Sequence, residues 1–374
     1  MNNGKHNFSV LVPKGHTNLL AFIVNCLSQI KNVEIYVISN NKKEDVRWSS
    51  KIKNFSFYPN TLDDKEWVEN LNNELEKFKI DLILPIDEYG ISTLIKHRNL
   101  LNQSDKLVLL PELDTFHLAN NKGLLSKHLD LFKIPAPISV MYNENEICHQ
   151  STIEFPILMK PLEGFGGGNG ISLFHDEASM KSFFSFNKID YPYLIQNYIN
   201  GYDIDCSVLC HCGKILVYTI QKGTLAGNSE FAPNIGLDFL YEEVLYNVVE
   251  KLIKSLNWSG VAHIDMRYDE GDGKFKVIEI NPRYWETTEA SEIAGINFPY
   301  LHCLASLNQS FEIPNYKHVK YLNLIGLSKT IRANLLFLFR FKFIFNNTPI
   351  KFYLKDPFPF LYIMFYKFKS LFRG

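Results

Sequence analysis

Two short alternating segments, His263–Tyr268 and Lys274–Ile280, constrain the fold of this chain more than any other feature of its sequence. The turn between them, Asp269–Gly273, combines acids with glycine, which is typical of a β-hairpin. If Tyr268 opposes Lys274, the even positions form an apolar face toward a core and the odd positions form the opposite face. The even face holds Ile264, Met266, Ile278 and Ile280, and the odd face holds His263, Asp265, Arg267, Val277, Glu279 and Asn281.

In this register Asp265 opposes Val277 and Glu279 opposes His263, so the two acids are diagonal neighbours about 7–8 Å apart. Two like charges on a largely buried sheet are unfavourable unless a cation lies between them. Carboxylate and amide oxygens suit Mg²⁺ or Mn²⁺ that bridges substrate phosphates. The hairpin therefore predicts a metal site formed by Asp265, Glu279 and Asn281, and the alternative is a solvated strand face with ordinary acids.

A second feature is a loop of five glycines between two strand-like runs, with Lys160 at the end of the strand that enters it. Glycine allows positive φ and lets backbone N–H groups approach an anion closely. A Walker A loop would lead into a helix, whereas Asn169-Gly170-Ile171 leads into another strand. The pattern predicts a mobile hairpin flap over phosphates, and the alternative is a flexible turn. The glycines are Gly164, Gly166, Gly167, Gly168 and Gly170.

The composition describes an ordinary globular protein of two or three domains, with 374 residues, 46% apolar and 21% charged. A net charge of −1 argues against general nucleic-acid binding, which needs a strongly basic face. Six scattered cysteines are too few for a disulfide framework. The N-terminus lacks a secretion signal, and no apolar stretch is long enough to span a bilayer. These observations predict a cytoplasmic protein.

Four apolar runs near the N-terminus alternate with helical spacing, which predicts a doubly wound parallel α/β domain. The expected strands are Phe8–Pro13, Val33–Ser39, Asp81–Pro85 and Lys106–Leu110. After a helical segment from Phe116, the chain changes to an α+β layout of largely antiparallel sheets. Its expected strands are Ile157–Lys160, Gly170–Phe174, Tyr193–Tyr198, Asp203–Cys212, Lys214–Gln221, Gly260–Tyr268 and Lys274–Ile280, with helices at Glu177–Phe184 and Tyr241–Leu256.

The segment from Lys329 to Gly374 differs sharply from the rest of the chain. It contains fourteen aromatic residues and nine Lys or Arg, against the single acid Asp356. Basic residues beside exposed aromatics suit the headgroup region of an anionic bilayer. The segment predicts peripheral attachment to the inner face of the membrane through residues 329–374, and the alternative is that the aromatics pack on the protein or on a second subunit.

In this order the motifs resemble the ATP-grasp superfamily, closest to its carbamoyl-phosphate-synthase-like and carboxylate–amine ligase branches, over about residues 1–325. The resemblance implies an N-terminal α/β domain (1–115) followed by a two-subdomain ATP-grasp fold. The first subdomain (116–190) holds the glycine flap, and the second (191–325) binds metal. A basic aromatic tail (326–374) follows.

Single residues match the motifs of that superfamily. Lys122 matches a lysine that reaches phosphate, and Lys160 with Gly166, Gly167 and Gly168 matches the strand lysine and the lid over the triphosphate. Gln196, Asn197, Tyr198 and Ile199 match the hinge that reads adenine, and Asp203 matches the acid that holds the ribose. Asp265, Glu279 and Asn281 match the Mg²⁺ ligands, and Arg283 matches the arginine near the transferred phosphoryl group. The chain departs from the pattern at Gln196, where an acid is common, and at Asp265, where many relatives use Glu.

The resemblance implies an ATP-dependent, ADP-forming ligase with ATP and Mg²⁺ (or Mn²⁺) as cofactors. A carboxylate would be activated as an acyl phosphate and attacked by an amine, with Lys160 and Arg283 as catalytic residues. The substrates would be a small-molecule or saccharide carboxylate and an amine. The sequence is compatible with an oligomer. Alternatives are an ATP-dependent phosphotransferase and a non-catalytic nucleotide-binding module at the membrane surface.

Other polar residues are candidates for the substrate side of the site. The segment Gln221–Gly236 is polar and glycine-dotted, and it either lines an acceptor pocket, with Lys222 meeting a carboxylate, or forms a surface loop. Asp87 and Glu88 follow an expected strand at the carboxyl edge, where α/β domains bind ligands. Trp285 follows the metal strand and either packs in the core or contacts substrate.

Overall fold

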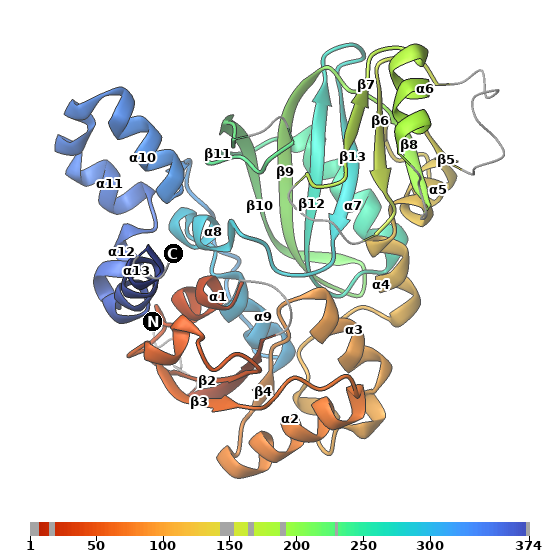
Figure 1. Ribbon diagram of the computed structural model, residues 1–374. Helices are drawn as coiled ribbons and strands as arrows, with labels where there is room; N and C mark the ends of the chain where they lie inside the picture. The colour runs from red at the N-terminus through yellow and green to blue at the C-terminus, as the bar shows by residue number, and fades with distance from the viewer. Residues whose placement is uncertain are drawn as a thin grey trace.

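The computed structural model describes residues 7–14, 19–142, 153–163, 168–187, 192–228 and 231–371, with side chains up to residue 366. Three sheets divide the chain in space, one at the N-terminus and two in the part that follows (Figure 1). The predicted order, a parallel N-terminal sheet and then antiparallel sheets, is confirmed. Three glycines of the predicted flap, Gly164, Gly166 and Gly167, lie outside the described residues.

The N-terminal sheet has four parallel strands in the order β3-β2-β1-β4. They are β1 (Phe8–Pro13), β2 (Val33–Ser39), β3 (Ile52–Phe57) and β4 (Leu82–Ile83). The predicted strand at Lys106–Leu110 is wrong, because Leu107 makes only an isolated bridge to Ile83. The fourth strand is instead β3, a half-buried edge strand whose polar residues hid it in the sequence.

Helices cover both faces of this sheet, which makes it doubly wound as predicted. Alternate residues of β1 point to opposite sides: Val10 and Val12 pack with α1, and Leu11 packs with α2. The helices of the domain are α1 (Leu20–Leu27), η1 (Asp45–Trp48), α2 (Asp64–Phe78), α3 (Glu88–Lys96), η2 (Arg98–Leu100) and η3 (Ser104–Lys106).

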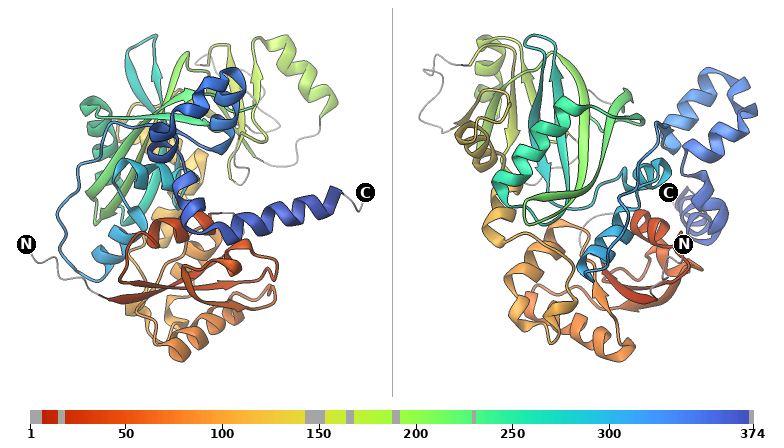
Figure 2. Two further views of the ribbon diagram at one scale, coloured as in Figure 1. Left: turned by 90° about the vertical axis from the view of Figure 1, so that its left-hand side faces the viewer. Right: turned by 180° about the vertical axis from the view of Figure 1, so that it is seen from behind.

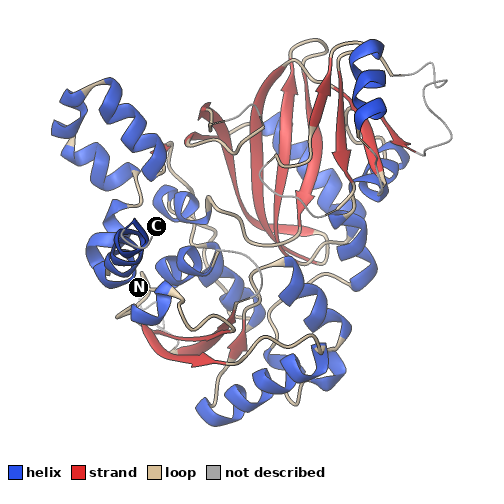
Figure 3. Cartoon of the chain, in the orientation of Figure 1, coloured by secondary structure: helices blue, strands red, loops and turns tan. Residues whose placement is uncertain are grey.

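The central element is a six-stranded antiparallel sheet in the order β13-β12-β9-β10-β11-β14 (Figure 3). Its strands are β9 (Gly201–His211), β10 (Lys214–Leu225), β11 (Gly236–Leu240), β12 (Gly260–Asp269), β13 (Lys274–Asn281) and β14 (Lys320–Leu322). Helix α7 (Glu243–Leu256) lies across one face of this sheet (Figure 2). The opposite face is left for the site described below.

A smaller antiparallel sheet, β5-β8-β6-β7, stands beside the central one. Its strands are β5 (Ser139–Tyr142), β6 (Ile157–Pro161), β7 (Ser172–Phe174) and β8 (Tyr193–Asn197), and the helices of this region are α4 (Leu113–Asn120), α5 (Lys122–Leu131) and α6 (Glu177–Phe186). The helical segment expected from Phe116 is broken at Asn121, whose side chain accepts from the N–H groups of Gly123 and Leu124 and caps α5. The break places Lys122 at the first position of α5.

The hairpin of β12 and β13 forms, but its predicted register is wrong. Tyr268 pairs with Phe275 rather than with Lys274, and a β-bulge between Asp265 and Met266 shifts the pairing so that Asp265 lies directly opposite Glu279. The extra residue of the bulge is Ile278. A bulge inverts the facing of the residues beyond it, so Val277 is buried in the core and Ile278 faces the site.

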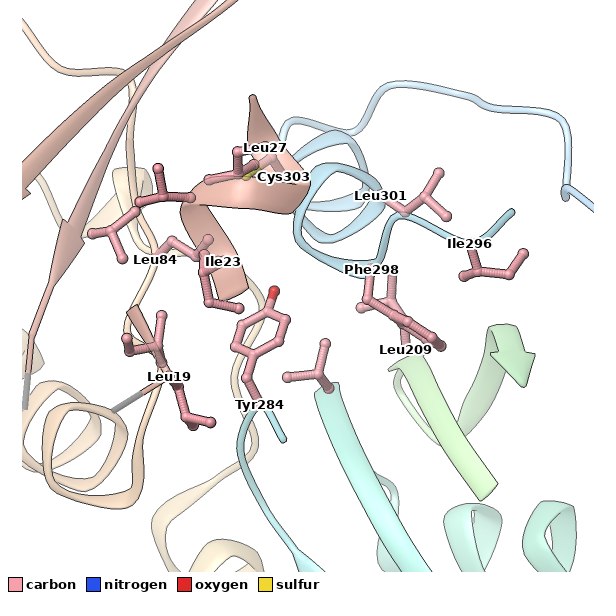
Figure 4. Packing of buried hydrophobic residues seen from close by; sticks show 14 of the residues in the cluster. Leu19, Ile23, Leu27, Leu84, Leu209, Tyr284, Ile296, Phe298, Leu301 and Cys303 are labelled. Carbon is pink, nitrogen blue, oxygen red and sulfur yellow. The ribbon is translucent and has the colours of Figure 1, made fainter. Parts of the chain in front are cut away.

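One hydrophobic core joins the N-terminal domain to the central sheet. Leu19, Ile23 and Leu84 pack with Leu209 of β9 and with Tyr284 (Figure 4). Helices α8 (Thr288–Ala294) and α9 (Phe298–Ser306) follow β13 and return to α1. The two parts are therefore packed together around the site.

The chain ends in a set of short helices along one side of the molecule (Figure 2). They are α10 (Leu324–Ala333), η4 (Leu335–Phe339), α11 (Phe341–Asn347), α12 (Ile350–Lys355) and α13 (Pro357–Leu371), here called the tail helices. Helix α13 contacts η1 of the N-terminal domain. Within the described part of the chain, no helix combines the length and apolar character needed to cross a bilayer.

Candidate active site

A cavity of about 790 Å³ opens between the central sheet and the smaller sheet. The strands β6, β8, β9, β12 and β13 supply its polar wall, and Phe22 of α1 reaches it from the N-terminal domain. Eleven of the residues predicted from the sequence line it: Lys160, Gly168, Gln196, Asn197, Tyr198, Ile199, Asp203, Asp265, Glu279, Asn281 and Arg283. Residues that lie up to 123 positions apart in the chain are thus brought into one space.

Lys160 is a buried cation in this cavity, with only 4% of its surface exposed. Its Nζ donates to Oε1 of Gln196 at 2.8 Å, and Nε2 of Gln196 donates to Oγ of Ser139 at 3.0 Å. Burial lowers the pKa of Lys160 to about 8, against a smaller opposing effect from Glu279. A buried ammonium that lacks a carboxylate in hydrogen-bond contact is suited to an anionic ligand.

Asp265 lies at the centre of a hydrogen-bonded polar cluster. Its Oδ1 is 3.1 Å from Nε2 of His263, and its Oδ2 accepts from Nδ2 of Asn281 at 3.1 Å. Burial acts to raise the pKa of Asp265, but the hydrogen bond and charge of His263, together with a hydrogen bond to Glu279 and the charge of Arg283, outweigh it and lower that pKa. His263 is itself fixed by Oγ of Ser207, 2.9 Å from its Nδ1. Asp265 is therefore held as a carboxylate.

Asp205 joins this cluster and was missed in the sequence. It lies on β9, and one of its carboxylate oxygens lies within 4.8 Å of a ring nitrogen of His263 and of a carboxylate oxygen of Asp265. Burial, followed by the charge of Asp265, raises the pKa of Asp205 well above its ordinary value. The signal was available, because Asp203 and Asp205 are two positions apart and share one face of a strand.

Glu279 lies directly opposite Asp265 and also forms an ion pair with a neighbouring helix. Its Oε2 lies 3.1 Å from Nζ of Lys122, the predicted phosphate lysine, at the start of α5. Lys122 does not line the cavity itself, but its ion pair with Glu279 joins α5 to β13.

The donor set of this wall fits a hard divalent cation. Asp205, Asp265, Glu279 and Asn281 offer carboxylate and amide oxygens, which is the ligand chemistry of Mg²⁺ and Mn²⁺. Burial first, and then the charges of Asp265 and Asp203, raise the pKa of Asp205, and a bound cation would oppose both effects.

Arg267 organises the predicted hinge and was also missed in the sequence. Its guanidinium forms an ion pair with Asp203, and it donates to the carbonyl oxygens of Ile199 at 2.9 Å and Gly201 at 2.8 Å. The hinge and the predicted ribose acid are thereby fixed to β12. The β-strand pattern placed Arg267 on the correct face, but nothing in the sequence indicated its partners.

Arg283, just after β13, connects this strand to the N-terminal domain. Its Nε pairs with Glu88 at the start of α3, and its Nη2 donates to Oδ1 of Asn281 at 3.2 Å. Glu88 is therefore brought to the edge of the site, whereas Asp87 caps α3 through the N–H of Gly90. This ion pair joins Glu88, predicted at the carboxyl edge of the N-terminal sheet, to Arg283, predicted near the transferred phosphoryl group.

The substrate-side candidates are only partly at the cavity. Residues 231–234 line the cavity, but Lys222 does not. The Nζ of Lys222 lies over the ring of Tyr202, 3.4 Å from its centroid. Trp285 is 3% exposed, stacks on His263 with ring centroids 5.3 Å apart, and also borders the cavity. Its Nε1 and Oε1 of Gln221 are buried without a hydrogen-bond partner among the described residues. Both atoms can therefore bind a polar ligand.

The fold and this site define a class of protein. Residues 119–288 match the family model of the ATP-grasp domain. This match confirms the predicted resemblance to the ATP-grasp superfamily over that part of the chain.

Curated proteins are also similar to this chain. The carbamoyl phosphate synthase large chain of Clostridium beijerinckii is 24% identical over 286 residues, covering 73% of this chain and 26% of the relative. The corresponding protein of Clostridium perfringens (strain 13) is 28% identical over 289 residues, with the same coverage. The chain spans about a quarter of the length of these curated relatives.

Two solved structures share the fold. N5-carboxyaminoimidazole synthetase of Staphylococcus aureus complexed with ADP has a TM-score of 0.69 at 16% identity, covering 90% of this chain and 87% of that one. The L-amino acid ligase of Bacillus licheniformis has a TM-score of 0.60 at 17% identity, covering 80% and 74%. The predicted fold class, an N-terminal parallel domain before an ATP-grasp fold, is confirmed.

Proposed function

We propose that the chain is an ATP-dependent, ADP-forming ligase that joins a carboxylate to an amine. The observation that carries the proposal is the convergence of Lys160, Asp265, Glu279, Asn281 and Arg283 on one cavity. Relatives named as ligase and as synthetase share its fold, and one of these structures contains ADP. These likenesses support a nucleotide in the cavity.

The proposed nucleotide pose follows the residues along the wall. Adenine lies against the hinge Gln196–Ile199 beside Ile278, and Asp203 accepts from the ribose hydroxyls. The triphosphate then passes Lys160, which is buried and whose Nζ donates to the amide of Gln196 rather than to a carboxylate of the described residues. Lys122 pairs with Glu279 in this structure, and a phosphate offers the same lysine a second anion.

The proposed metal ligands are Asp265, Glu279 and Asn281, with Asp205 beside them. These residues would hold a divalent ion, which would supply positive charge to the phosphates during transfer.

The proposed chemistry is transfer of the terminal phosphoryl group to a carboxylate oxygen, which leaves ADP and an acyl phosphate. The amine then attacks the acyl carbon, the bond to phosphate breaks, and an amide and inorganic phosphate remain. Arg283 offers its guanidinium to the developing charge at the edge of the cavity, where Glu88 orients it. Most of the rate enhancement in such transfers comes from positioning and electrostatic stabilisation.

The proposal is tested by removing one carboxylate. Glu279→Ala is expected to lower ADP release by at least about 10²–10³-fold, the typical effect of losing one preorganised stabiliser. The control is Glu270→Ala, which removes an exposed acid in the turn of the same hairpin. Circular dichroism and the thermal midpoint should be unchanged in both. Near-wild-type turnover of Glu279→Ala would refute the assignment.

Acceptor identity is tested by measuring ADP release over amino acids, sugar acids and amines, with and without Mg²⁺. Release that requires both a carboxylate and an amine supports the ligase. A stable phosphorylated product without amine identifies a phosphotransferase, and binding of ADP without turnover identifies a nucleotide-binding module.

A further inference from the structure

The tail helices expose a large amount of apolar surface. Thirteen of the twenty-five exposed large hydrophobic residues in the described part of the chain fall between Ile325 and Tyr366. Single exposed apolar residues are ordinary on a protein surface, but contiguous ones mark an interaction site. The most exposed lie in η4 and at the start of α11: Leu335 (69%), Leu336 (71%), Phe339 (72%) and Phe341 (71%).

Helix α13 is apolar on both sides, and only its inner side is covered. The ring of Tyr362 contacts that of Trp48 of η1 in a tilted arrangement with 5.8 Å between centroids, and Phe360 lines a cavity against the N-terminal domain. On the outer side of α13, Phe358, Leu361 and Phe365 follow helical spacing and are 55–63% exposed, and Leu354 of α12 is 66% exposed. The inner contacts fix the helix on the protein, so the outer stripe faces outward.

The charge of the tail is opposite to that of the rest of the chain. Nine Lys or Arg and one Asp give residues 329–374 a net charge of +8, and the remaining chain, with 30 basic and 39 acidic residues, totals −9. Asp356 is buried and accepts from Oγ and the N–H of Ser50, both at 3.1 Å. The exposed cations Arg332, Arg340 and Lys342 therefore stand beside the exposed Phe and Leu side chains without an exposed acid between Lys329 and Tyr366.

We propose that the tail helices dock on the surface of an anionic lipid bilayer. Exposed aromatic and aliphatic side chains enter the boundary between headgroups and acyl chains, while neighbouring Lys and Arg bind the anionic headgroups. Both parts of the surface lie on one side of the molecule (Figures 1 and 2). A soluble acidic partner would match the positive charge of the tail helices but would leave Phe339 and Phe341 in water. An anionic bilayer matches both the charge and the exposed apolar side chains.

The docking surface borders the proposed acceptor side of the cavity. Gly326 of α10 lies against the backbone of Ile235, and Nζ of Lys329 donates to the carbonyl oxygen of Gly227 at 3.3 Å. Residues 231–234 of the same segment line the cavity. A bilayer on the tail helices therefore lies next to this wall, which suits a substrate held at the membrane.

The test is co-sedimentation of the full chain with vesicles. Phosphatidylcholine vesicles with 30% phosphatidylglycerol are expected to bind at least tenfold more protein than phosphatidylcholine alone at about 50 mM salt, and less at about 500 mM salt, because salt screens the headgroup charge. Arg340→Glu with Lys342→Glu should lower binding to anionic vesicles at least tenfold, and so should Phe339→Glu with Phe341→Glu.

The matched control is Phe186→Glu. Phe186 is 86% exposed at the end of α6, on the opposite side of the molecule from the tail helices (Figure 1), and this change should leave vesicle binding unaltered. Thermal midpoints of all variants establish that they fold. Equal binding to neutral and anionic vesicles, or no binding, would overturn the proposal. A dimer in light scattering that Phe339→Glu dissociates, without vesicle capture, would assign the surface to a second copy instead.

Discussion

Lys160 is buried and its hydrogen-bond partner is the neutral amide of Gln196. A bound anion would therefore change the protonation of Lys160. Burial lowers its pKa to about 8, so the free protein at pH 8.5 carries Lys160 mostly as the neutral amine. An anion close to the ammonium favours the charged form and raises the pKa. Lys160 contacts the amide of Gln196 rather than a carboxylate, so the effect of a phosphate would not be masked.

The prediction is that MgADP binding at pH 8.5 takes up to about three quarters of a proton, the neutral fraction for a pKa of about 8, and at pH 6.5 almost none. Calorimetry in buffers of different ionisation enthalpy measures this number directly. Lys160→Arg is the matched variant, because arginine keeps the positive charge and does not titrate in this range. The same proton uptake in Lys160→Arg would show that another group is responsible.

The sequence predicted most of the cavity residues because they sit in short motifs. Asp265, Glu279 and Asn281 are placed by strand alternation, and Lys160 by its strand and the glycines after it. Arg267 and Asp205 were missed as site residues, since their importance lies in partners on other strands. The ion pair of Arg267 with Asp203 depends on the packing of β12 on β9, which no local pattern specifies.

At the scale of elements, the hairpin shows where alternation fails as a guide. The pattern of β12 and β13 predicted two strands and a turn, and both form. The pattern does not report the bulge at Ile278, because an apolar residue there is compatible with either face. The turn shifts the register by one residue and the bulge by another, and together they change the partner of Asp265 from Val277 to Glu279. The two acids therefore lie directly opposite each other, whereas the sequence placed them diagonally.

The entry to β9 depends on a glycine. Gly201 has φ of 158°, and a Cβ built there would lie 1.8 Å from the carbonyl oxygen of Tyr268. That carbonyl belongs to the backbone of β12, which cannot move without breaking the pairing of the two strands. Gly201 also accepts from Nη2 of Arg267, so the same position supports the hinge.

Gly201→Ala is expected to destabilise the protein by about 2–4 kcal/mol, as a backbone clash in a packed sheet. Urea denaturation followed by circular dichroism measures this change. Gly271→Ala is the control, since its Cβ would meet only a side-chain oxygen of Asp269 at 3.1 Å in an exposed turn. A loss of less than about 0.5 kcal/mol in Gly201→Ala would show that β9 shifts freely.

At the scale of the molecule, three regions meet around one buried acid. Glu289 of α8 is 1% exposed and accepts from Nδ2 of Asn25 in α1 at 2.6 Å. The charge of Lys351 in α12 opposes the effect of burial on its pKa. Helix patterning alone predicted neither this junction nor the packing of the tail helices, because both depend on long-range contacts. The order of sheets, by contrast, followed from alternation and turns.

Burial raises the pKa of Glu289 from 4.5 to about 7. The unfolded chain releases this proton near pH 4.5, so between about pH 4.5 and 7 the folded protein binds more protons and its free energy of unfolding falls as pH rises. The stabilisation is present at low pH and is lost through pH 7. The full difference is about 3 kcal/mol at roughly 1.4 kcal/mol per pKa unit.

Glu289→Gln removes the titration and keeps an acceptor for Asn25. The variant is expected to be about 1–3 kcal/mol more stable than the wild type at pH 8, and within about 1 kcal/mol of it at pH 5. Urea denaturation at the two pH values measures both differences. Glu69→Gln on the exposed side of α2 is the control and should shift neither. A difference between Glu289→Gln and wild type that does not change with pH would mean that Glu289 stays charged in the junction.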